Sequence, residues 1–459
     1  MPITFVTNLI DLKLNIMKKN KFILLFSLLA ILISCTEEDP IIEYVTVTKT
    51  VIDKVIEIQN VAIDSNTDST LQGNITSDTT LDASKIWLLK GRVSVLDGVT
   101  LTIPAGTIIK AAAGTGADAS TLIIARGATI LANGTADAPI IMTSISDNIE
   151  VGGDYPSNGP SLNVDTRGLW GGLIILGYAP SSFSGDVTEL QIEGIPTSDT
   201  SGLYGGSDAA DNSGTVEYLS IRHGGAEIGE GNEINGLTLG GVGSGTTINH
   251  IEIVGNVDDG IEFFGGTVNA SNLLVWGQGD DAIDIDQGYA GTIDGALVVL
   301  TAASDHGFEI DGPEGSTTGR FTLKNATVIG ATDNCTSEGV DGEMADFRKG
   351  ATGDLLNILF KNFASGKDVE LDASADATTY TAGTLTFANI DILHPVDAEG
   401  AVCSDVETLD LIFDDKSDES TFETDASTFA EVVTAQADGN GLADDSIFSW
   451  TFYAYVTNI

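Results

Sequence analysis

Apolar and acidic residues alternate strictly in three similar segments near the middle of the chain. These segments are residues 258–264, 280–286 and 305–311, and they begin 22 and 25 residues apart. Each starts with a polar turn, and the alternation that follows predicts a strand with one buried face. A repeat of this length predicts a solenoid, in which each strand pairs with its equivalent in the next coil.

The alternation continues on both sides of these segments, at residues 237–240, 345–348 and 369–372. Placed in register, the segments predict two inward stacks of apolar side chains and two outward stacks that are mostly acidic. The first outward stack is Thr238, Glu262, Asp284, Glu309, Asp346 and Glu370, and the second is Gly240, Phe264, Asp286, Asp311, Arg348 and Asp372.

Carboxylates stacked in this way need a compensating interaction. Neighbouring strands lie about 4.8 Å apart, so like charges directly above one another repel and destabilise the sheet. A bound cation, raised pKa values, or Arg348 with water would each offset the repulsion. We predict a Ca²⁺ site on this face, with the following ligands: Glu262, Asp284, Asp286, Glu309 and Asp311.

Composition restricts the class of partner. The 459 residues carry a net charge of −47, which makes nucleic acid a poor partner and divalent cations good ones. Such acidity also serves as a solubility device in exported proteins. With 42% hydrophobic residues, the chain is too apolar to be disordered, and its 53 Gly and 10 Pro indicate many turns and few helices.

The N-terminus has the features of a lipoprotein signal. A basic segment that begins at Met17 precedes an apolar run, residues 22–33, which is too short to span a bilayer. Residues 32–35 resemble the lipobox of bacterial lipoproteins, which implies cleavage before Cys35 and a lipid on that residue. The acidic residues 36–39 resemble a surface-export signal of Gram-negative lipoproteins. We therefore expect initiation at Met17, a signal peptide over residues 1–35 and an outer-membrane lipoprotein that faces outward, with a periplasmic orientation as the alternative.

The remainder of the chain divides into three regions. Residues 36–80 are predicted to form a tether and N-terminal cap, residues 81–400 the β-helix, and residues 401–459 a C-terminal cap rich in aromatic residues. Segments 145–168 and 178–214 are rich in Gly, Ser, Asp and Pro and interrupt the repeat. We expect them to be long side loops that form the walls of a binding surface.

Two cysteines remain when Cys35 carries lipid. In an oxidising compartment, Cys335 and Cys403 are expected to form a disulfide. Cys335 lies in the longest spacing of the repeat, so the disulfide would join a loop inserted into one coil to the C-terminal region.

Residues 80–350 resemble a family of bacterial secreted right-handed β-helix proteins. The resemblance rests on the short strands separated by Gly and Asp, together with residues 222–227 and 258–266. It implies an all-β fold with a single right-handed parallel β-helix of the pectate-lyase-like type, and an exported location. It implies no settled activity.

The acidic turns also resemble those of polygalacturonases, in which paired Asp residues and a Gly-His-Gly motif on successive coils surround the scissile bond. That resemblance implies that Asp259, Asp280 and Asp281 act as acid and base, with His306 assisting them. Two carboxylates on adjacent coils would flank a sugar and a water molecule, as inverting hydrolysis requires.

The polygalacturonase pattern is incomplete in this chain. Its Asn-Thr-Asp element is replaced by Asn-Val-Asp at residues 256–258, and its Arg-Ile-Lys element has only Arg348 and Lys349 as a substitute. The alternative is that Asp-Asp-Gly is ordinary turn chemistry in a β-helix. A calcium-dependent lyase would in addition need a basic residue to accept a proton, and bases are few.

Three aromatic residues near the acidic stacks, Phe264, Trp276 and Tyr289, are candidates for stacking on a sugar, with Arg348 beside them. They could equally pack under a loop. Taken together, the residues predict a monomeric surface lipoprotein that binds a glycan or another surface ligand through Ca²⁺. A hydrolase or lyase of pectin-type polysaccharides and a structural adhesin or stalk are the alternatives.

Overall fold

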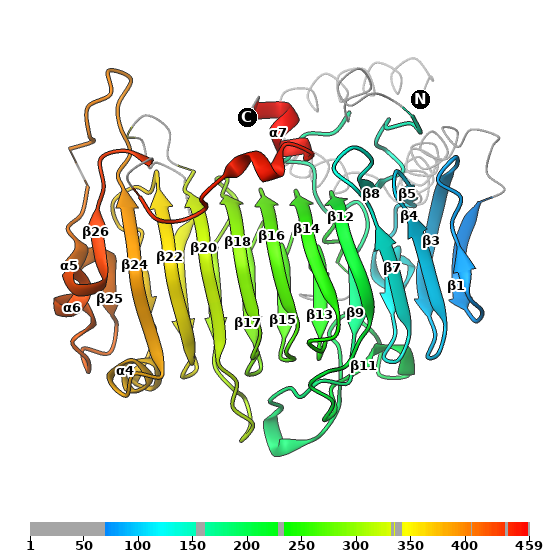
Figure 1. Cartoon of the computed structure of the whole chain (residues 1–459), viewed down its shortest axis with the longest axis horizontal. Coiled ribbons are helices and arrows are strands. Elements are labelled where there is room, and N and C mark those ends of the chain that lie inside the picture. Colours follow the sequence, from blue (N-terminus) through cyan, green and yellow to red (C-terminus); the bar gives the residue numbers. More distant parts are fainter. Residues whose placement is uncertain are drawn as a thin grey trace, which may run out of the picture. The chain divides into compact units, whose positions relative to one another are not determined.

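Parallel strands, stacked coil upon coil, make up most of the structure (Figure 1). The computed structural model describes residues 69–152, 161–227, 234–331, 335, 342–404, 406–436 and 439–457. The described residues belong to the unit Ser65–Ile459. The predicted signal peptide with Cys35, and most of the predicted tether, lie outside the described residues. No helix in the described part of the chain combines the length and apolarity needed to cross a membrane.

The strands form three parallel faces within one sheet that has 24 strands in the described residues. The prediction of a single parallel β-helix is confirmed. From β12 onward, each long strand contributes its first half to face 1 and its second half to face 2, while short strands build face 3. The strands are β1(Thr70–Ile75), β2(Thr79–Thr80), β3(Ile86–Val95), β4(Thr100–Pro104), β5(Ile108–Ala111), β6(Thr121–Ile124), β7(Thr129–Asn133), β8(Ile140–Ser144), β9(Leu173–Leu176), β12(Gly214–Arg222), β13(Leu237–Gly240), β14(Thr247–Val254), β15(Ile261–Phe264), β16(Asn269–Trp276), β17(Ile283–Asp286), β18(Thr292–Val299), β19(His306–Asp311), β20(Phe321–Ile329), β21(Glu343–Arg348), β22(Gly353–Lys361), β23(Val369–Leu371), β24(Leu385–Leu393), β25(Phe413–Asp415) and β26(Ala430–Val432).

The remaining elements lie outside this stack. A two-stranded antiparallel pair, β10(Leu190–Gln191) and β11(Leu203–Tyr204), lies in the loop 178–214. The helices are α4(Ser374–Thr381), α5(Leu409–Ile412), α6(Phe422–Phe429) and α7(Phe452–Thr457), with 3₁₀ turns η1(Gly116–Asp118), η2(Ser184–Asp186), η3(Thr200–Gly202) and η5(Asp445–Phe448). The strand stack starts at β1 and ends at β26, so it extends beyond residues 81–400 at both ends.

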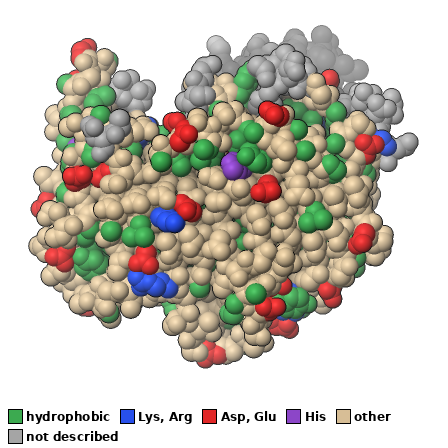
Figure 2. Space-filling model, in the orientation of Figure 1, with side chains coloured by type: hydrophobic (Ala, Val, Ile, Leu, Met, Phe, Trp, Pro, Cys, Tyr) green, Lys and Arg blue, Asp and Glu red, His purple; other side chains and the backbone are tan. Residues whose placement is uncertain are grey.

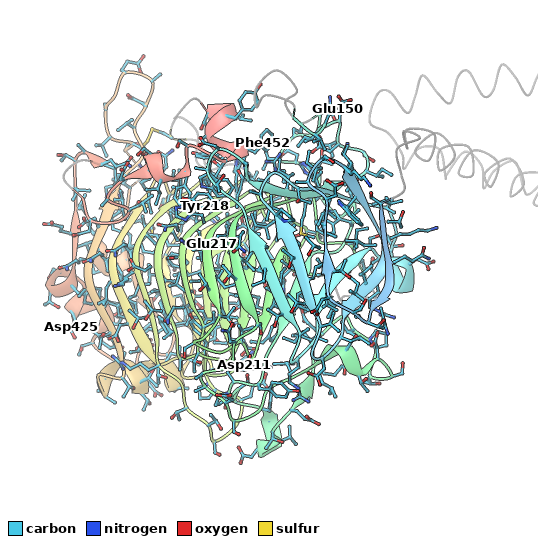
Figure 3. The ribbon with its side chains drawn as sticks, turned by 45° about the vertical axis from the view of Figure 1, so that its right-hand side comes forward. Glu150, Asp211, Glu217, Tyr218, Asp425 and Phe452 are labelled. Atoms are coloured by element: carbon cyan, nitrogen blue, oxygen red, sulfur yellow. A yellow bond between two sulfur atoms is a disulfide. The ribbon has the colours of Figure 1, made fainter. Side chains whose placement is uncertain are left out.

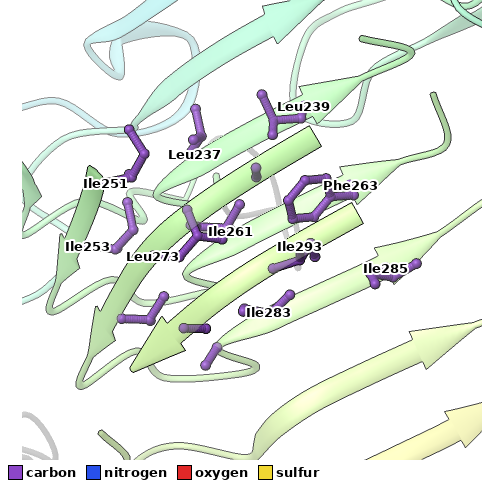
Figure 4. Packing of buried hydrophobic residues seen from close by; sticks show 14 of the residues in the cluster. Leu237, Leu239, Ile251, Ile253, Ile261, Phe263, Leu273, Ile283, Ile285 and Ile293 are labelled. Atoms are coloured by element: carbon purple, nitrogen blue, oxygen red, sulfur yellow. The ribbon is translucent and has the colours of Figure 1, made fainter. Parts of the chain in front are cut away.

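The predicted register of face 3 is the observed one. Leu237, Ile261 and Ile283 are partners on successive coils, and the series continues through Phe308, Ala345 and Val369. These side chains are at most 1% exposed and fill the interior of the coils. Figure 4 shows this packing for Leu237, Ile261 and Ile283. Apolar stacking along the solenoid therefore fixes which residues point outward.

A bend with left-handed backbone separates faces 1 and 2. Asn272, Asn325, Asn357 and Asn389 each occupy this bend with φ between 55° and 58°. Asn tolerates this region better than most residues. Asn357 donates its amide to Asn325 Oδ1 at 3.0 Å, and Asn389 donates to Asn357 Oδ1 at 2.8 Å. The side chains thus form a ladder that holds equivalent bends in register.

The two ends of the predicted C-terminal cap have different positions. Residues 401–432 close the last coil, where Phe413, Phe422 and Phe429 pack against one another. Residues 439–457 instead run back over face 2, so that α7 lies above the middle coils (Figure 1). There Phe448 packs against two side chains of β16 and β18, Leu274 and Leu297, whose outward apolar faces need cover.

The disulfide between Cys335 and Cys403 is present, with the two Cα atoms 5.5 Å apart. It joins the insertion between β20 and β21 to the segment that follows β24. The predicted pairing is therefore confirmed.

Candidate acidic site on face 3

The acidic stack on face 3 lies largely beneath other parts of the chain. Glu262, Asp284 and Glu309 are partners on consecutive coils, as predicted. They are only 6%, 8% and 8% exposed. These side chains point outward from the coils as predicted, but in this part of the acidic stack they are buried. On the side of the molecule that Figure 2 shows, the acidic side chains are scattered.

The loop 178–214 supplies the cover at the N-terminal end of this ladder. Phe183, Ile192, Ile195 and Tyr204 from this loop pack with Phe264 in an apolar cluster on the outer side of face 3. Burial of the apolar loop residues stabilises this position of the loop. The neighbouring carboxylates are thereby removed from water.

Three carboxylates gather at the covered end. Asp259, Glu262 and Asp284 each place one carboxylate oxygen within 4.8 Å of the others. Asn235 donates its side-chain amide to Glu262 Oε2. Asp284 Oδ1 and Asn235 Oδ1 are both buried without a hydrogen-bond partner in the described structure. The arrangement provides buried oxygen acceptors for which the described side chains supply no further donor.

Burial and mutual repulsion both raise the pKa values of these three carboxyl groups. Desolvation, followed by the charge of Asp284, raises the pKa of both Asp259 and Glu262 well above the ordinary values. Desolvation and the charge of Glu309 do the same for the pKa of Asp284. Among the described residues, no Lys, Arg or His forms an ion pair with any of the three. The cluster consequently takes up either protons or a cation.

The carboxylates on the next coil of face 3, Glu309 and Asp311, are neutralised by basic side chains. Arg348 Nε donates to Asp311 Oδ1 at 2.8 Å, and its Nη2 atom pairs with Glu309. Lys349 Nζ lies 2.5 Å from Asp311 Oδ2. Glu309 and Asp311, predicted as metal ligands, therefore have cationic partners within the chain. Arg348 was predicted to bind a ligand. A ligand would have to compete with Glu309 and Asp311 for its guanidinium, because both carboxylates already pair with it.

Asp286, the fifth predicted metal ligand, lies between the two halves of the ladder. Its Oδ1 accepts the backbone N–H of Gln287 at 2.6 Å. Burial and the charge of Asp311 raise its pKa to about 6. It is not part of the group formed by Asp259, Glu262 and Asp284.

The acidic turns between faces 2 and 3 connect successive coils by hydrogen bonds. Asp259 Oδ1 accepts the backbone N–H of Asp281 at 3.0 Å, and Asp281 Oδ1 accepts that of His306 at 2.9 Å. These contacts are turn chemistry, in which one carboxylate fixes the start of the next coil. They occupy two of the carboxylates predicted to act as acid and base.

Asp280 lies at the surface end of these turns. Desolvation, together with the charges of Asp281 and Asp305, raises its pKa to about 6. One oxygen of Asp280 lies within 4.8 Å of oxygens from Asp258 and Asp259. Inverting hydrolysis requires a separation of roughly 6.5–9.5 Å to admit a water molecule. The nearest oxygens of these groups lie closer than this range, and the inverting pair stays a prediction.

The aromatic residues predicted to bind a sugar are occupied by protein contacts. Tyr289 is 1% exposed and packs on Phe263 inside the coils, while Phe264 is 6% exposed beneath Tyr204. Trp276 contacts the rings of Phe452 and Tyr453 in α7. The expectation of stacking on a sugar is not met in this structure, because the loop 178–214, the core and α7 cover these rings.

Sequence reasoning missed Asn235. It lies two residues before the inward residue Leu237, and Asp259, Asp281 and His306 hold the equivalent position in the next coils, so the register contained a signal for it. No periodic signal indicated that the loop 178–214 covers these carboxylates, because its residues do not follow the repeat.

Comparisons with known proteins place this geometry in a family. The model of the family described as pectate-lyase-like beta helix domain matches residues 73–452. No curated protein matches the chain, and no solved structure matches it.

Proposed function

Because the chain belongs to the family of pectate-lyase-like β-helix domains, we propose that it is an exported β-helix protein that binds Ca²⁺ and a glycan. Asp259, Glu262 and Asp284 are the proposed carboxylate ligands, and Asn235 Oδ1 is a neutral ligand. The observation that carries this proposal is the buried, unpartnered Asp284 Oδ1 among three clustered carboxylates.

The spacing of the oxygens supports a single ion. Ca²⁺ binds oxygen at about 2.3–2.6 Å, so two ligands of one ion lie at most about 5 Å apart. The observed limit of 4.8 Å satisfies this condition. Six to eight oxygens are normally required, and bidentate carboxylates with water would complete the set.

A bound cation would also offset the free-energy cost of burying three ionised carboxylates together. Burying an ionised carboxylate costs several kcal/mol for each ion unless it is compensated. Three such groups in mutual contact add repulsion, whereas a divalent ion attracts all three. Protonation is the competing solution, and it would leave the cluster without affinity for a metal at neutral pH.

The proposed location rests on the N-terminal sequence. Residues 17–35 have the order of a lipoprotein signal, and a lipid on Cys35 would anchor the chain to the outer membrane with the β-helix outward. The net charge of −47 suits an exported protein and disfavours nucleic acid as a partner. We propose that the protein acts as a monomer.

Hydrolysis of a pectin-type polysaccharide is the second candidate. Asp280 favours it, because an acid with a pKa of about 6 at a partly exposed turn suits proton donation near neutral pH. Release of reducing sugar from polygalacturonate, lost in Asp280→Asn and retained in Asp258→Asn, would support this activity.

Calorimetric titration with Ca²⁺, combined with thermal melts, tests the main proposal. We expect the metal-free chain to bind Ca²⁺ and its melting temperature to rise. The double variant Glu262→Gln/Asp284→Asn should lose both effects. Glu370→Gln is the matched control, since Glu370 belongs to the same stack but pairs with Lys416 at 3.0 Å. Absence of binding to the wild-type chain, or equal loss in the control, would refute the site.

A further inference from the structure

A second candidate binding site lies on the first coils of face 3, on the N-terminal side of the acidic stack. It is a cleft of about 370 Å³, which lies within the range of roughly 300–1,000 Å³ found for ligand sites. The end of β1 and the turns that follow β3, β6 and β9 form one side, and η3 with the preceding Asp199 forms the other. The residues that line it include Asn74, Asp97, Arg126, Tyr178, Asp199 and Thr200.

Contacts between the loop 178–214 and the first coils hold the cleft in shape. Arg126 Nη1 donates to the carbonyl oxygen of Gly205 at 2.7 Å, and its Nη2 pairs with Glu189 Oε2 at 2.7 Å. Arg92 Nε lies 3.2 Å from Asp199 Oδ2. Both walls are therefore joined by ion pairs, and binding would not require the loop to be ordered first.

The floor of the cleft contains an accessible aromatic ring. Tyr178 is 37% exposed, and the guanidinium carbon of Arg126 lies 4.7 Å from the centroid of its ring. The contact fixes the ring while leaving part of it open to solvent. This differs from Phe264 and Tyr289, which are buried, and from Trp276, which is partly buried against the rings of α7.

Polar side chains surround that ring. Asn74, Asp97 and Thr200 are exposed, and their side chains form no hydrogen bond or ion pair with another residue in the described part of the chain. An amide, a carboxylate and a hydroxyl group provide both donors and acceptors. Hydroxyl groups of a sugar match such a set, and the C–H face of a sugar matches an aromatic ring.

The charges restrict the class of sugar. Arg126 and Arg92 are neutralised by Glu189 and Asp199, whereas Asp97 has no cationic partner among the described residues. Together with the net charge of −47, this arrangement repels uronates and other polyanions. We infer that the cleft binds a neutral glycan, with Tyr178 as the stacking platform and Asp97 and Asn74 as hydrogen-bonding groups. This inference rests on the proposed glycan binding, and it places that binding away from the Ca²⁺ site.

Titration of the full chain, purified in detergent and saturated with Ca²⁺, provides the test. The probes are a neutral glycan array, followed by calorimetry with the best neutral oligosaccharide and with oligogalacturonate of equal length. We expect the neutral sugar to bind. Tyr178→Ala should weaken binding by about tenfold, Asp97→Asn should also weaken it, and Tyr178→Phe should retain it.

Tyr455→Ala is the matched control, because Tyr455 in α7 has the same 37% exposure and lies outside the cleft lining. Melting curves of each variant identify any loss that comes from unfolding. Binding that is unchanged in Tyr178→Ala and Asp97→Asn would overturn the location while leaving glycan binding intact. Preference for oligogalacturonate, or no binding of any neutral glycan, would overturn the inference, and Ca²⁺ titration of the same sample would decide the metal site separately.

Discussion

Asp281 Oδ1 accepts two hydrogen bonds from His306 of the next coil, one from the backbone N–H at 2.9 Å and one from Nδ1 at 2.8 Å. Asp305 Oδ2 lies 3.8 Å from the same ring nitrogen. The imidazole thus lies beside two carboxylates at the start of β19, where the sequence resembles a polygalacturonase motif. The geometry favours a protonated ring, which would be a donor rather than a base.

The first prediction concerns the protonation of His306. Burial lowers its pKa, but the hydrogen bond and charge of Asp281, with Asp305, outweigh burial and raise the pKa to about 9. NMR titration should show this histidine charged at neutral pH, and Asp281→Asn should lower its pKa. His394, whose pKa burial lowers, is the internal control. A His306 pKa near the ordinary value of about 6.5 would contradict the prediction.

The raised pKa of His306 also makes the stability of the folded state depend on pH. Since the pKa of His306 is raised in the folded state, its contribution is fully present below about pH 6.5 and is lost as the pH rises through about 9. In Asp281→Asn this part of the pH dependence should disappear.

The second prediction concerns the carboxylates of the metal-free protein. Burial raises the pKa of Asp280 to about 6, and burial with the charge of Glu370 raises the pKa of Asp346 to about 7. The folded state therefore binds more protons than the unfolded state between about pH 4 and 7, and stability should fall as the pH rises through this window. Thermal melts with a chelator measure the effect.

Addition of Ca²⁺ is the control for the second prediction. A cation bound at Asp259, Glu262 and Asp284 favours the ionised carboxylates, so it should flatten the loss of stability toward neutral pH. At a free ion concentration 100 times the dissociation constant, the gain is about 2.7 kcal/mol. A metal-free protein whose stability rises from pH 4 to 7 would contradict the prediction.

Periodicity was sufficient to predict face 3. Glu262, Asp284 and Glu309 lie in the predicted stack because their apolar neighbours must point inward, and a shift of one residue would reverse the faces. The disulfide also followed from simple counting, because only Cys335 and Cys403 remained once Cys35 was expected to carry the lipid.

The environment of that stack could not be read from periodicity. Burial of Glu262 depends on the loop 178–214, an irregular segment whose path has no repeat. Neutralisation of Asp311 by Arg348 differs in this respect, because the two residues are neighbours in the predicted stack and are register partners in the structure. Trp276 shows the same limit, since it is covered by α7 from the end of the chain.

The third prediction concerns the disulfide. Cys335 and Cys403 are 68 residues apart, and closure of a loop of this length restricts the unfolded chain by about 4 kcal/mol in the chain-entropy model. Cys335→Ser/Cys403→Ser should lower the melting temperature and increase hydrogen exchange in segment 394–404. Reduction of the wild-type protein should reproduce both effects, while the double variant should not respond to the reductant. Equal exchange in both proteins would show that the loop is held by other contacts.

The fourth prediction concerns the attachment of α7 to face 2. Glu252 is 0% exposed, its Oε1 accepts the backbone N–H of Tyr453 at 2.9 Å, and its Oε2 lies 3.6 Å from Arg222 Nη2. The guanidinium of Arg222 also lies over the ring of Phe452, which is labelled in Figure 3. Removal of Glu252 would leave Arg222 buried without this partner.

Glu252→Ala should therefore destabilise this region by about 3–5 kcal/mol and release α7. Hydrogen exchange should increase in residues 446–457 and remain unchanged in the apolar stack of face 3. Glu217→Ala is the surface control, because Glu217 is partly exposed on the same group of coils. The pair Arg222→Met/Glu252→Met should recover most of the loss, since replacing a buried ion pair by apolar residues is often neutral. Unchanged exchange in Glu252→Ala would show instead that the apolar contacts of Phe448 hold the segment on their own.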